Sequence, residues 1–191
     1  CGGVDPNVCM PVMLDVGTEN AALREDRLYL GLSHERIRGD AYDQLVEEFI
    51  AAANLLFPHV LMQFEDFANA NAFQILQRYR DRACCFNDDI QGTGAVALSG
   101  LLTAARALGN RLPDHRLLFV GAGEAGLGIG HAVVSEMQIQ GLSAEAAAAR
   151  CWFIDSQGLV VKSRTHLPPH KQPFAQDHAP LMDLVTAIEN V

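Results

Sequence analysis

The sequence predicts an α/β fold in which helices cover a parallel β-sheet. Short apolar runs that are typical of strands alternate along the chain with helical patterns of ten or more residues, as in sheets whose parallel strands are joined by helices. Polar clusters follow three of these apolar runs. Because ligands of such sheets bind at the carboxyl ends of the strands, we expect the three clusters to meet at one edge of the fold.

Composition excludes several classes of protein. Of the 191 residues, 49% are hydrophobic, which supports a sizeable core, and the net charge is −9 without a basic cluster. We therefore expect no nucleic-acid partner. No apolar run reaches the roughly 18 residues of a membrane span, so we expect no membrane partner. The odd number of cysteines and the lack of a signal peptide favour a cytoplasmic protein, with an organelle such as the mitochondrion left open.

The first predicted element is a short strand at residues 12–16, which a turn-forming stretch ends. A surface connection containing four arginines follows at 21–38. A helix begins at Asp40, because the apolar residues after it fall on one helical face and Pro58 follows its end. The next predicted elements are a strand at 60–64, a helix at about 70–79 and a strand at 83–86.

The second half continues the alternation. Residues 90–108 form a predicted helix rich in small residues, closed by Gly109. The remaining predicted elements are a strand at 116–120, helices at 124–138 and 143–150, a strand at 151–154, a proline-rich loop at 163–180 and a final helical stretch.

Two acidic pairs, Glu65-Asp66 and Asp88-Asp89, each follow a predicted strand. Converging carboxylates repel one another unless a cation lies between them or one of them takes a proton. A set of oxygen ligands favours a hard ion, Mg²⁺ or Mn²⁺. Alternatively, the acids are N-caps and first-turn charges of the helices that follow, where the helix dipole favours them. Since a cap needs one acceptor and each junction has two acids, we favour the metal.

A glycine-rich turn, Gly121-x-Gly123-x-x-Gly126, follows the strand at 116–120 and opens a helix. This context is typical of a dinucleotide site, in which the pyrophosphate sits on the helix N-terminus. Asp155 ends a later strand and would bind the adenine ribose, although it lies 29 residues past Gly126 where about 20 is usual. A purely structural turn is the alternative.

Cations near Asp155 bear on the choice of cofactor. Lys162, Arg164 and Lys171 follow it and could meet a 2′-phosphate, which favours NADP over NAD, or they are solvated loop charges. The chain has no other lysine. A hydroxy acid that loses hydride needs a base, and at the acidic pairs only Asp88 is at hand.

Several motifs together resemble the malic enzyme family over essentially the whole chain. They are Met13-Leu-Asp-Val-Gly-Thr-Glu-Asn20, Gln63-Phe-Glu-Asp-Phe-Ala-Asn69, Phe86-Asn-Asp-Asp-Ile-Gln-Gly-Thr93, Phe119-Val-Gly-Ala-Gly-Glu-Ala-Gly126 and Trp152-Phe-Ile-Asp-Ser-Gln-Gly-Leu159.

The resemblance implies a role for each motif residue. The metal ligands would be Glu65, Asp66 and Asp89, with Asp88 as an acidic catalytic neighbour. The cofactor would contact Asn69, Asp89, Thr93, the turn Gly121, Ala122, Gly123, Glu124, Ala125 and Gly126, and then Asp155 and Ser156.

The resemblance also implies the reaction and its setting. Malate would be oxidatively decarboxylated to pyruvate and CO₂ with reduction of NAD(P)⁺, in a homo-oligomer that is a dimer or a tetramer. Residues 1–87 would belong to the substrate and metal domain, and 88–191 to the N-terminal part of a Rossmann-type domain. The family's catalytic lysine and tyrosine would precede Cys1, so we expect these 191 residues alone to be inactive. The rival interpretations are another metal-dependent hydroxy-acid dehydrogenase and a non-catalytic nucleotide-binding module.

Overall fold

The computed structural model describes residues 3–191, except for the side chains of residues 69 and 70. The chain forms two compact units, Cys1–Val60 and Leu61–Val191. These units are not the substrate and cofactor domains predicted from the sequence. The boundary between those domains at residue 87 stays a prediction. Within the described residues, every helix is too short or too polar to cross a bilayer.

The first unit holds η1 (Pro6–Val8), α1 (Ala21–Glu25) and α2 (Asp40–Leu56). The predicted start of α2 at Asp40 is confirmed. The strand predicted at 12–16 is wrong, because this segment is extended without a strand beside it. Single backbone hydrogen bonds hold it instead, one of them from Ile37 N to the Val16 carbonyl at 2.9 Å.

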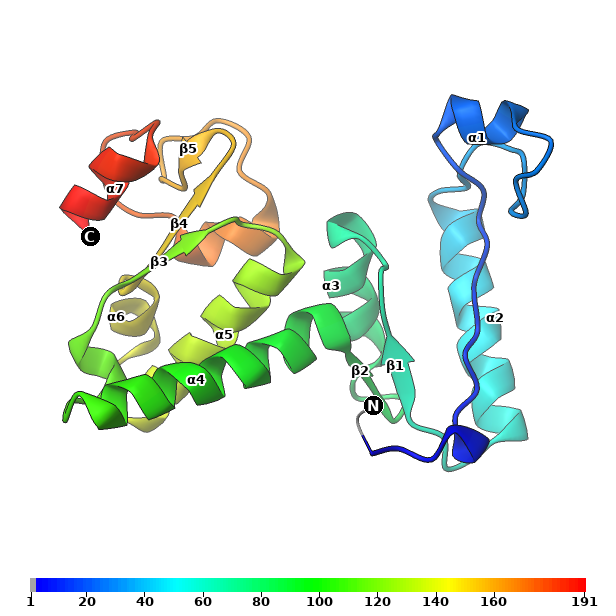
Figure 1. Ribbon diagram of the computed structural model, residues 1–191, viewed down its shortest axis with the longest axis horizontal. Helices are drawn as coiled ribbons and strands as arrows, with labels where there is room; N and C mark the ends of the chain where they lie inside the picture. The colour runs from blue at the N-terminus through cyan, green and yellow to red at the C-terminus, as the bar shows by residue number, and fades with distance from the viewer. Residues whose placement is uncertain (1–2) are drawn as a thin grey trace. The chain divides into compact units, whose positions relative to one another are not determined.

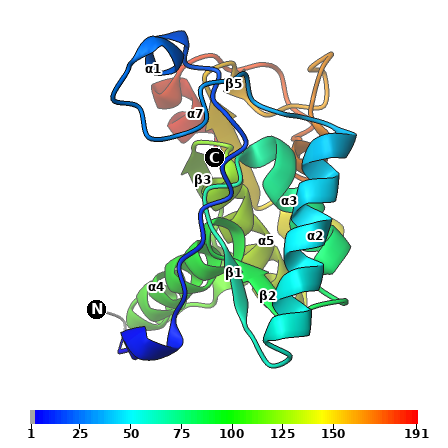
Figure 2. The same cartoon turned by 90° about the vertical axis from the view of Figure 1, so that its right-hand side faces the viewer.

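The second unit begins with a two-stranded parallel sheet of β1 (Met62–Phe64) and β2 (Cys85–Asn87). The crossover between them contains α3 (Asn69–Tyr79), and Figure 2 shows the two strands side by side. Phe64 pairs with Asn87 at the end of both strands. The residues that follow each strand therefore leave the sheet at the same edge.

A second sheet has the order β3 (Leu117–Val120), β4 (Cys151–Asp155) and β5 (Gly158–Leu159). β3 and β4 are parallel, as predicted. β5 is an antiparallel addition that the sequence did not predict. A two-residue turn precedes it, and Gly158 at the start of β5 has a φ of +90°, which few other residues adopt.

Helices cover one face of this second sheet, and the C-terminal segment packs on the other. Along β4, Cys151 and Phe153 lie in a core cluster with residues of α5 (Glu124–Ile139) and α6 (Ala144–Ala148). Trp152 points to the other face, where it packs with Leu159 and Val191. The other elements are η2 (Asp88–Gly92), α4 (Thr93–Ala107), η3 (Leu112–Asp114), η4 (Pro169–Phe174) and α7 (Leu184–Asn190), and Figure 1 shows α4 lying beside α5.

Candidate metal and dinucleotide site

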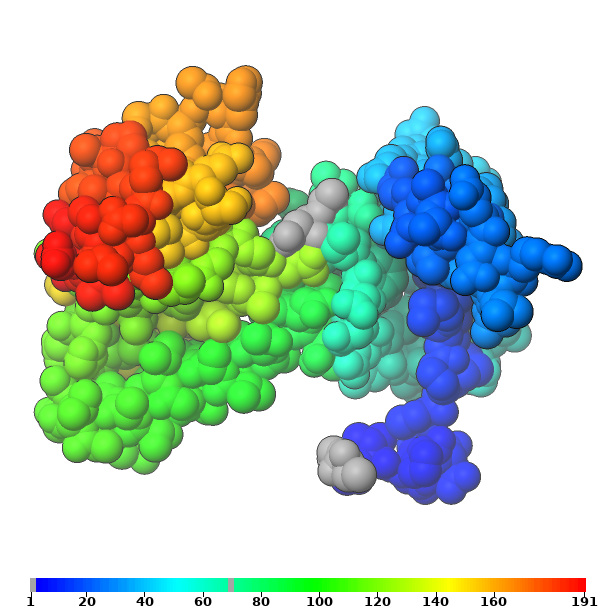
Figure 3. All heavy atoms as spheres, turned by 45° about the horizontal axis from the view of Figure 1, so that its top comes forward, coloured from blue at the N-terminus to red at the C-terminus, as the bar shows by residue number. Residues whose placement is uncertain are grey.

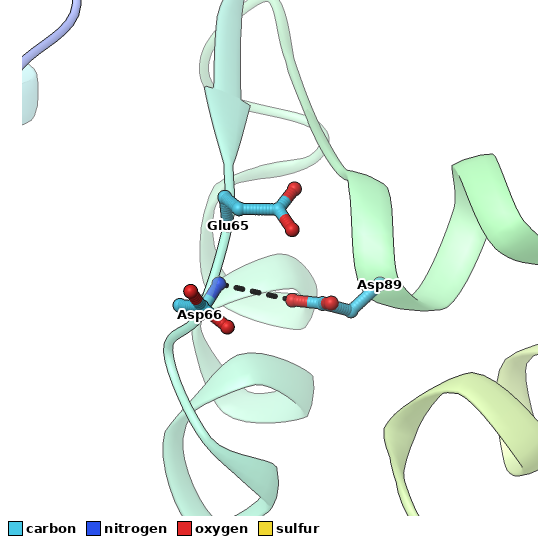
Figure 4. Close-up of side chains that lie close together, drawn as sticks. All are labelled: Glu65, Asp66 and Asp89. Carbon is cyan, nitrogen blue, oxygen red and sulfur yellow. Dashed lines mark hydrogen bonds between the residues drawn. The ribbon is translucent and has the colours of Figure 1, made fainter.

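The carboxyl ends of β1 and β2 bring the two acidic pairs together. Ligand atoms of Glu65, Asp66 and Asp89 all lie within 4.8 Å of one another (Figure 4). The backbone N–H of Asp66 donates a hydrogen bond to Asp89 Oδ2 at 3.0 Å. The three carboxylates thus face one point, as a hard divalent ion requires of oxygen ligands.

None of these acids is the N-cap of the helix that follows it, although Asp88 and Asp89 lie in the first turn of η2. The N-cap residue of α3 is Ala68, with no side-chain cap, and the residue that caps η2 is Asn87. Asp66 and Ala68 instead adopt positive φ angles of 59° and 60°. Left-handed backbone at a residue other than glycine costs about 1–3 kcal/mol and clusters at functional sites.

The electrostatics of the cluster are those of crowded negative charge. Desolvation raises the pKa of Glu65, and the charges of Asp89 and Asp88 raise it further. Burial likewise raises the pKa of Glu124, assisted by Asp89 and Asp66. A proton or a cation relieves such repulsion, so the donor set fits a divalent metal.

Asp88 stands beside the cluster. Its carboxylate makes a side-chain hydrogen bond that contributes to the raised pKa of Glu65. It also lines a shallow pocket together with Thr93, whose backbone N–H donates to the Asp88 carbonyl. The predicted catalytic acid and one predicted cofactor contact therefore share a surface.

The glycine-rich turn lies between β3 and α5. Gly121 has a φ of +120°, and a Cβ atom on Gly126 would overlap the Gly121 carbonyl, so the turn needs glycine at both positions. α5 begins at Glu124 with Gly123 as its N-cap and no side-chain cap. Its first backbone N–H groups are therefore oriented to receive an anion. Ala122 is buried and Ala125 exposed in the same turn.

Asp155, the predicted ribose contact, is held by two cations. Arg164 donates from Nη1 to Oδ2 at 3.1 Å and from Nη2 to Oδ1 at 3.0 Å, and Lys171 Nζ lies 2.8 Å from Oδ2. Burial raises the pKa of Asp155, but these hydrogen bonds outweigh it and hold the pKa well below the ordinary value. Ser156 is exposed in the adjoining turn.

A second pocket opens next to this ion pair. Its polar lining includes Arg164, Thr165, Gln172 and Lys162, and the last of these lies 3.7 Å from Asp177. The sequence pointed to the cations near Asp155, but not to the ion pairs that Arg164 and Lys171 form with it.

Asn87 was missed as a site residue, although asparagine before a helix is a known cap signal. The predicted side chain of Asn69 lies outside what the structure describes.

Fold and turn together define a nucleotide-binding α/β protein with a cluster of carboxylates beside the turn. Family models agree with that class. The model described as "Malic enzyme, N-terminal domain" matches residues 1–80, and the model described as "Malic enzyme, NAD binding domain" matches residues 90–191. The chain therefore belongs to the malic enzyme family.

Relatives extend over the whole chain. The NADP-dependent malic enzyme of Anas platyrhynchos is 54% identical over 192 residues, which are 100% of this chain and 34% of that protein. The mitochondrial NADP-dependent malic enzyme of Homo sapiens is 49% identical, over 100% of this chain and 32% of that protein. The chain thus spans about a third of the length of these relatives.

Solved structures share the fold. The crystal structure of the Entamoeba histolytica malic enzyme superposes with a TM-score of 0.52 at 25% identity, over 64% of this chain and 24% of that one. The NAD-dependent malic enzyme of Thermotoga maritima gives a TM-score of 0.50 at 24% identity, over 65% of this chain and 32% of that one.

Proposed function

We propose that this chain carries the metal ligands and the dinucleotide turn of an enzyme that oxidatively decarboxylates malate to pyruvate and CO₂, with NADP⁺ as the hydride acceptor. The grouping of Glu65, Asp66 and Asp89 within 4.8 Å is the observation that carries the proposal. Relatives named NADP-dependent malic enzyme support it, since they match the chain over its whole length.

Glu65, Asp66 and Asp89 would hold Mg²⁺ or Mn²⁺. When bound, such an ion supplies Lewis-acid polarisation of the substrate oxygens at the reacting carbon and a template that orients the substrate. The strained Asp66 backbone and its hydrogen bond to Asp89 fix two of the three ligands relative to each other. Such preorganisation reduces the free-energy cost of gathering the carboxylates.

Asp88 would handle the proton of the substrate hydroxyl. It lies next to the ligands and faces Glu65, so it can accept a proton without leaving the site. Both lysines lie near other acids, Lys171 2.8 Å from Asp155 and the exposed Lys162 3.7 Å from the exposed Asp177. We therefore expect little or no turnover from these 191 residues without further proton-transfer groups.

The N-terminus of α5 would bind the pyrophosphate of the cofactor, and the Asp155 turn would bind the adenine ribose. Because Arg164 and Lys171 neutralise Asp155, a 2′-phosphate at this turn meets cations rather than a free carboxylate. This arrangement favours NADP over NAD. A homo-oligomeric dimer or tetramer and a cytoplasmic or mitochondrial location complete the proposal.

The rival function is a nucleotide-binding module without a metal. Asp89→Asn tests it, because the change removes one ligand charge and keeps the side chain's shape. We expect Mn²⁺, titrated by electron paramagnetic resonance, to bind the unaltered chain and to bind Asp89→Asn at least ten-fold more weakly. Asp81→Asn is the matched control, since Asp81 precedes β2 and so lies at the opposite end of that strand. Equal Mn²⁺ affinity in all three proteins would rule out the metal site.

A further inference from the structure

We propose that Asn87 is the positioning residue of the carboxylate site, and that its buried amide sets the turn that carries Asp89 to its place opposite Asp66. This inference rests on the proposed metal function and adds to it a residue that touches no substrate. Asn87 ends β2, pairs with Phe64 of β1, and is only 1% exposed. Asn87 is therefore the last paired residue of the sheet before the chain continues into Asp88 and Asp89.

Asn87 is bonded to the turn from both its side chain and its backbone. Its Oδ1 accepts from the backbone N–H of Ile90 at 2.8 Å. Its own backbone N–H donates to Oε1 of Gln91 at 3.0 Å. Both bonds reach from Asn87 over Asp88 and Asp89 to the residues that follow them. The acidic pair therefore lies within a turn that Asn87 closes at two points.

The enclosed turn is a π-helical one, with the N–H of Thr93 bonded to the carbonyl of Asp88. A π turn holds one residue more than an α turn and is often found at functional sites, because the extra residue changes the direction in which side chains point. Ile90, 6% exposed, anchors it in a core cluster with Ala72 and Leu76 of α3. Asp88 and Asp89 lie between the Asn87 cap and this anchor, and Oδ2 of Asp89 accepts from Asp66 N–H at 3.0 Å.

The amide nitrogen of Asn87 bears on why this position holds asparagine. Its Nδ2 is buried and has no hydrogen-bond partner in the part of the chain that the structure describes. A buried donor left unpaired is unfavourable, yet an aspartate would add a third, buried negative charge next to Asp88 and Asp89. Asparagine thus caps the turn without adding to the repulsion at the site.

The experiment compares Asn87→Ala with Gln176→Ala in the 191-residue chain. Gln176 is also a buried amide, 8% exposed, and its Nε2 donates to the Cys151 carbonyl at 3.0 Å, at the end of β4 away from the acidic pairs. Both variants should lose stability in urea, because each removes a buried amide that accepts or donates hydrogen bonds. We expect only Asn87→Ala to lose Mn²⁺ affinity, by about 10–100-fold, as for other residues that orient metal ligands. Asn87→Ser, whose hydroxyl still accepts from Ile90, should recover part of the loss.

Amide hydrogen exchange at Asp66 gives a readout that does not depend on metal. In Asn87→Ala this N–H should exchange faster, because Asp89 no longer accepts from it, whereas Gln176→Ala should leave its exchange unchanged. Unaltered Mn²⁺ affinity with unaltered Asp66 exchange in Asn87→Ala would overturn the assignment, as would an equal loss of affinity in Gln176→Ala. If the unaltered chain binds no Mn²⁺, the proposed function fails, and Asp66 exchange alone still decides the role of Asn87.

Discussion

Replacing Gly128 with alanine should push α5 away from the turn that carries the acidic pair. A Cβ atom there would lie 2.8 Å from both the carbonyl carbon and the Cα of Ile90, and closer still to the carbonyl oxygen. On its other side, Gly128 touches α4, where a Cβ on Gly94 would lie 3.1 Å from the Gly128 carbonyl oxygen. All of these neighbours are backbone atoms, which cannot rotate aside as a side chain can.

The magnitude follows from two opposed effects. Alanine gains about 1 kcal/mol over glycine inside a helix. The overlap requires the backbones to separate by roughly 1 Å to reach an ordinary contact, and overpacking of this kind costs about 1–3 kcal/mol or more. With rigid backbone on both sides we take the upper value, so Gly128→Ala should lower the free energy of unfolding by about 2 kcal/mol.

The matched control is Gly100→Ala. Gly100 is exposed on α4, which lies at the surface in Figure 3, and nothing comes within 4 Å of a Cβ atom built on it. This variant should gain up to about 1 kcal/mol from helix propensity alone. Urea unfolding of both variants measures the difference, about 3 kcal/mol in total from these two estimates. Equal stability of Gly128→Ala and the unaltered chain would refute the close approach of α5 to Ile90.

Two further predictions concern other strained or charged positions. Asp155→Asn should cost about 3 kcal/mol at neutral pH, because Arg164 and Lys171 are left without their partner. Since the folded pKa of Asp155 is depressed, this stability is present above the ordinary value of 3.8 and is lost as the pH falls below it. A stability gap between the two proteins that does not shrink in urea titrations below that pH would contradict the ion pairs. Ala68→Gly should raise stability by about 1 kcal/mol, because Ala68 has φ 60° and ψ 151°, a region nearly reserved for glycine. A lower melting temperature for Ala68→Gly would argue against that backbone.

Patterns in the sequence predicted the elements whose signals are local. The start of α2 at Asp40 and the strand that ends at Val120 follow from hydrophobic periodicity and turn residues. The strand expected at 12–16 failed because a strand also needs a neighbour to bond, and alternation alone does not supply one. The short β5 escaped notice for the opposite reason, since two residues are too few to show a pattern.

The candidate site was predictable as a set of residues, but not in its arrangement. Parallel strands bring residues at their carboxyl ends to one edge, so the approach of Glu65 to Asp89 follows from the order of elements. The positive φ of Asp66 accompanies a hydrogen bond to Asp89, which lies more than twenty residues further along the chain. The π turn after Asn87 is closed by local bonds, but no pattern in the sequence distinguishes it from an α turn. The pairing of Asp155 with Arg164 and Lys171 likewise depends on how the loop after β5 returns to the strand.

The order β3-β4-β5 has a consequence for handling this chain in solution. Among residues 3–191, β3 pairs with a strand on one side alone, so its other side presents N–H and C=O groups at the edge of the second sheet. Open edges of this kind act as templates for strands of other molecules and promote aggregation. Val120, at the end of β3, is 71% exposed and adds an apolar side chain to that edge. Concentrated samples of the 191-residue chain should therefore self-associate along β3, and a lysine in place of Val120 should keep them dispersed.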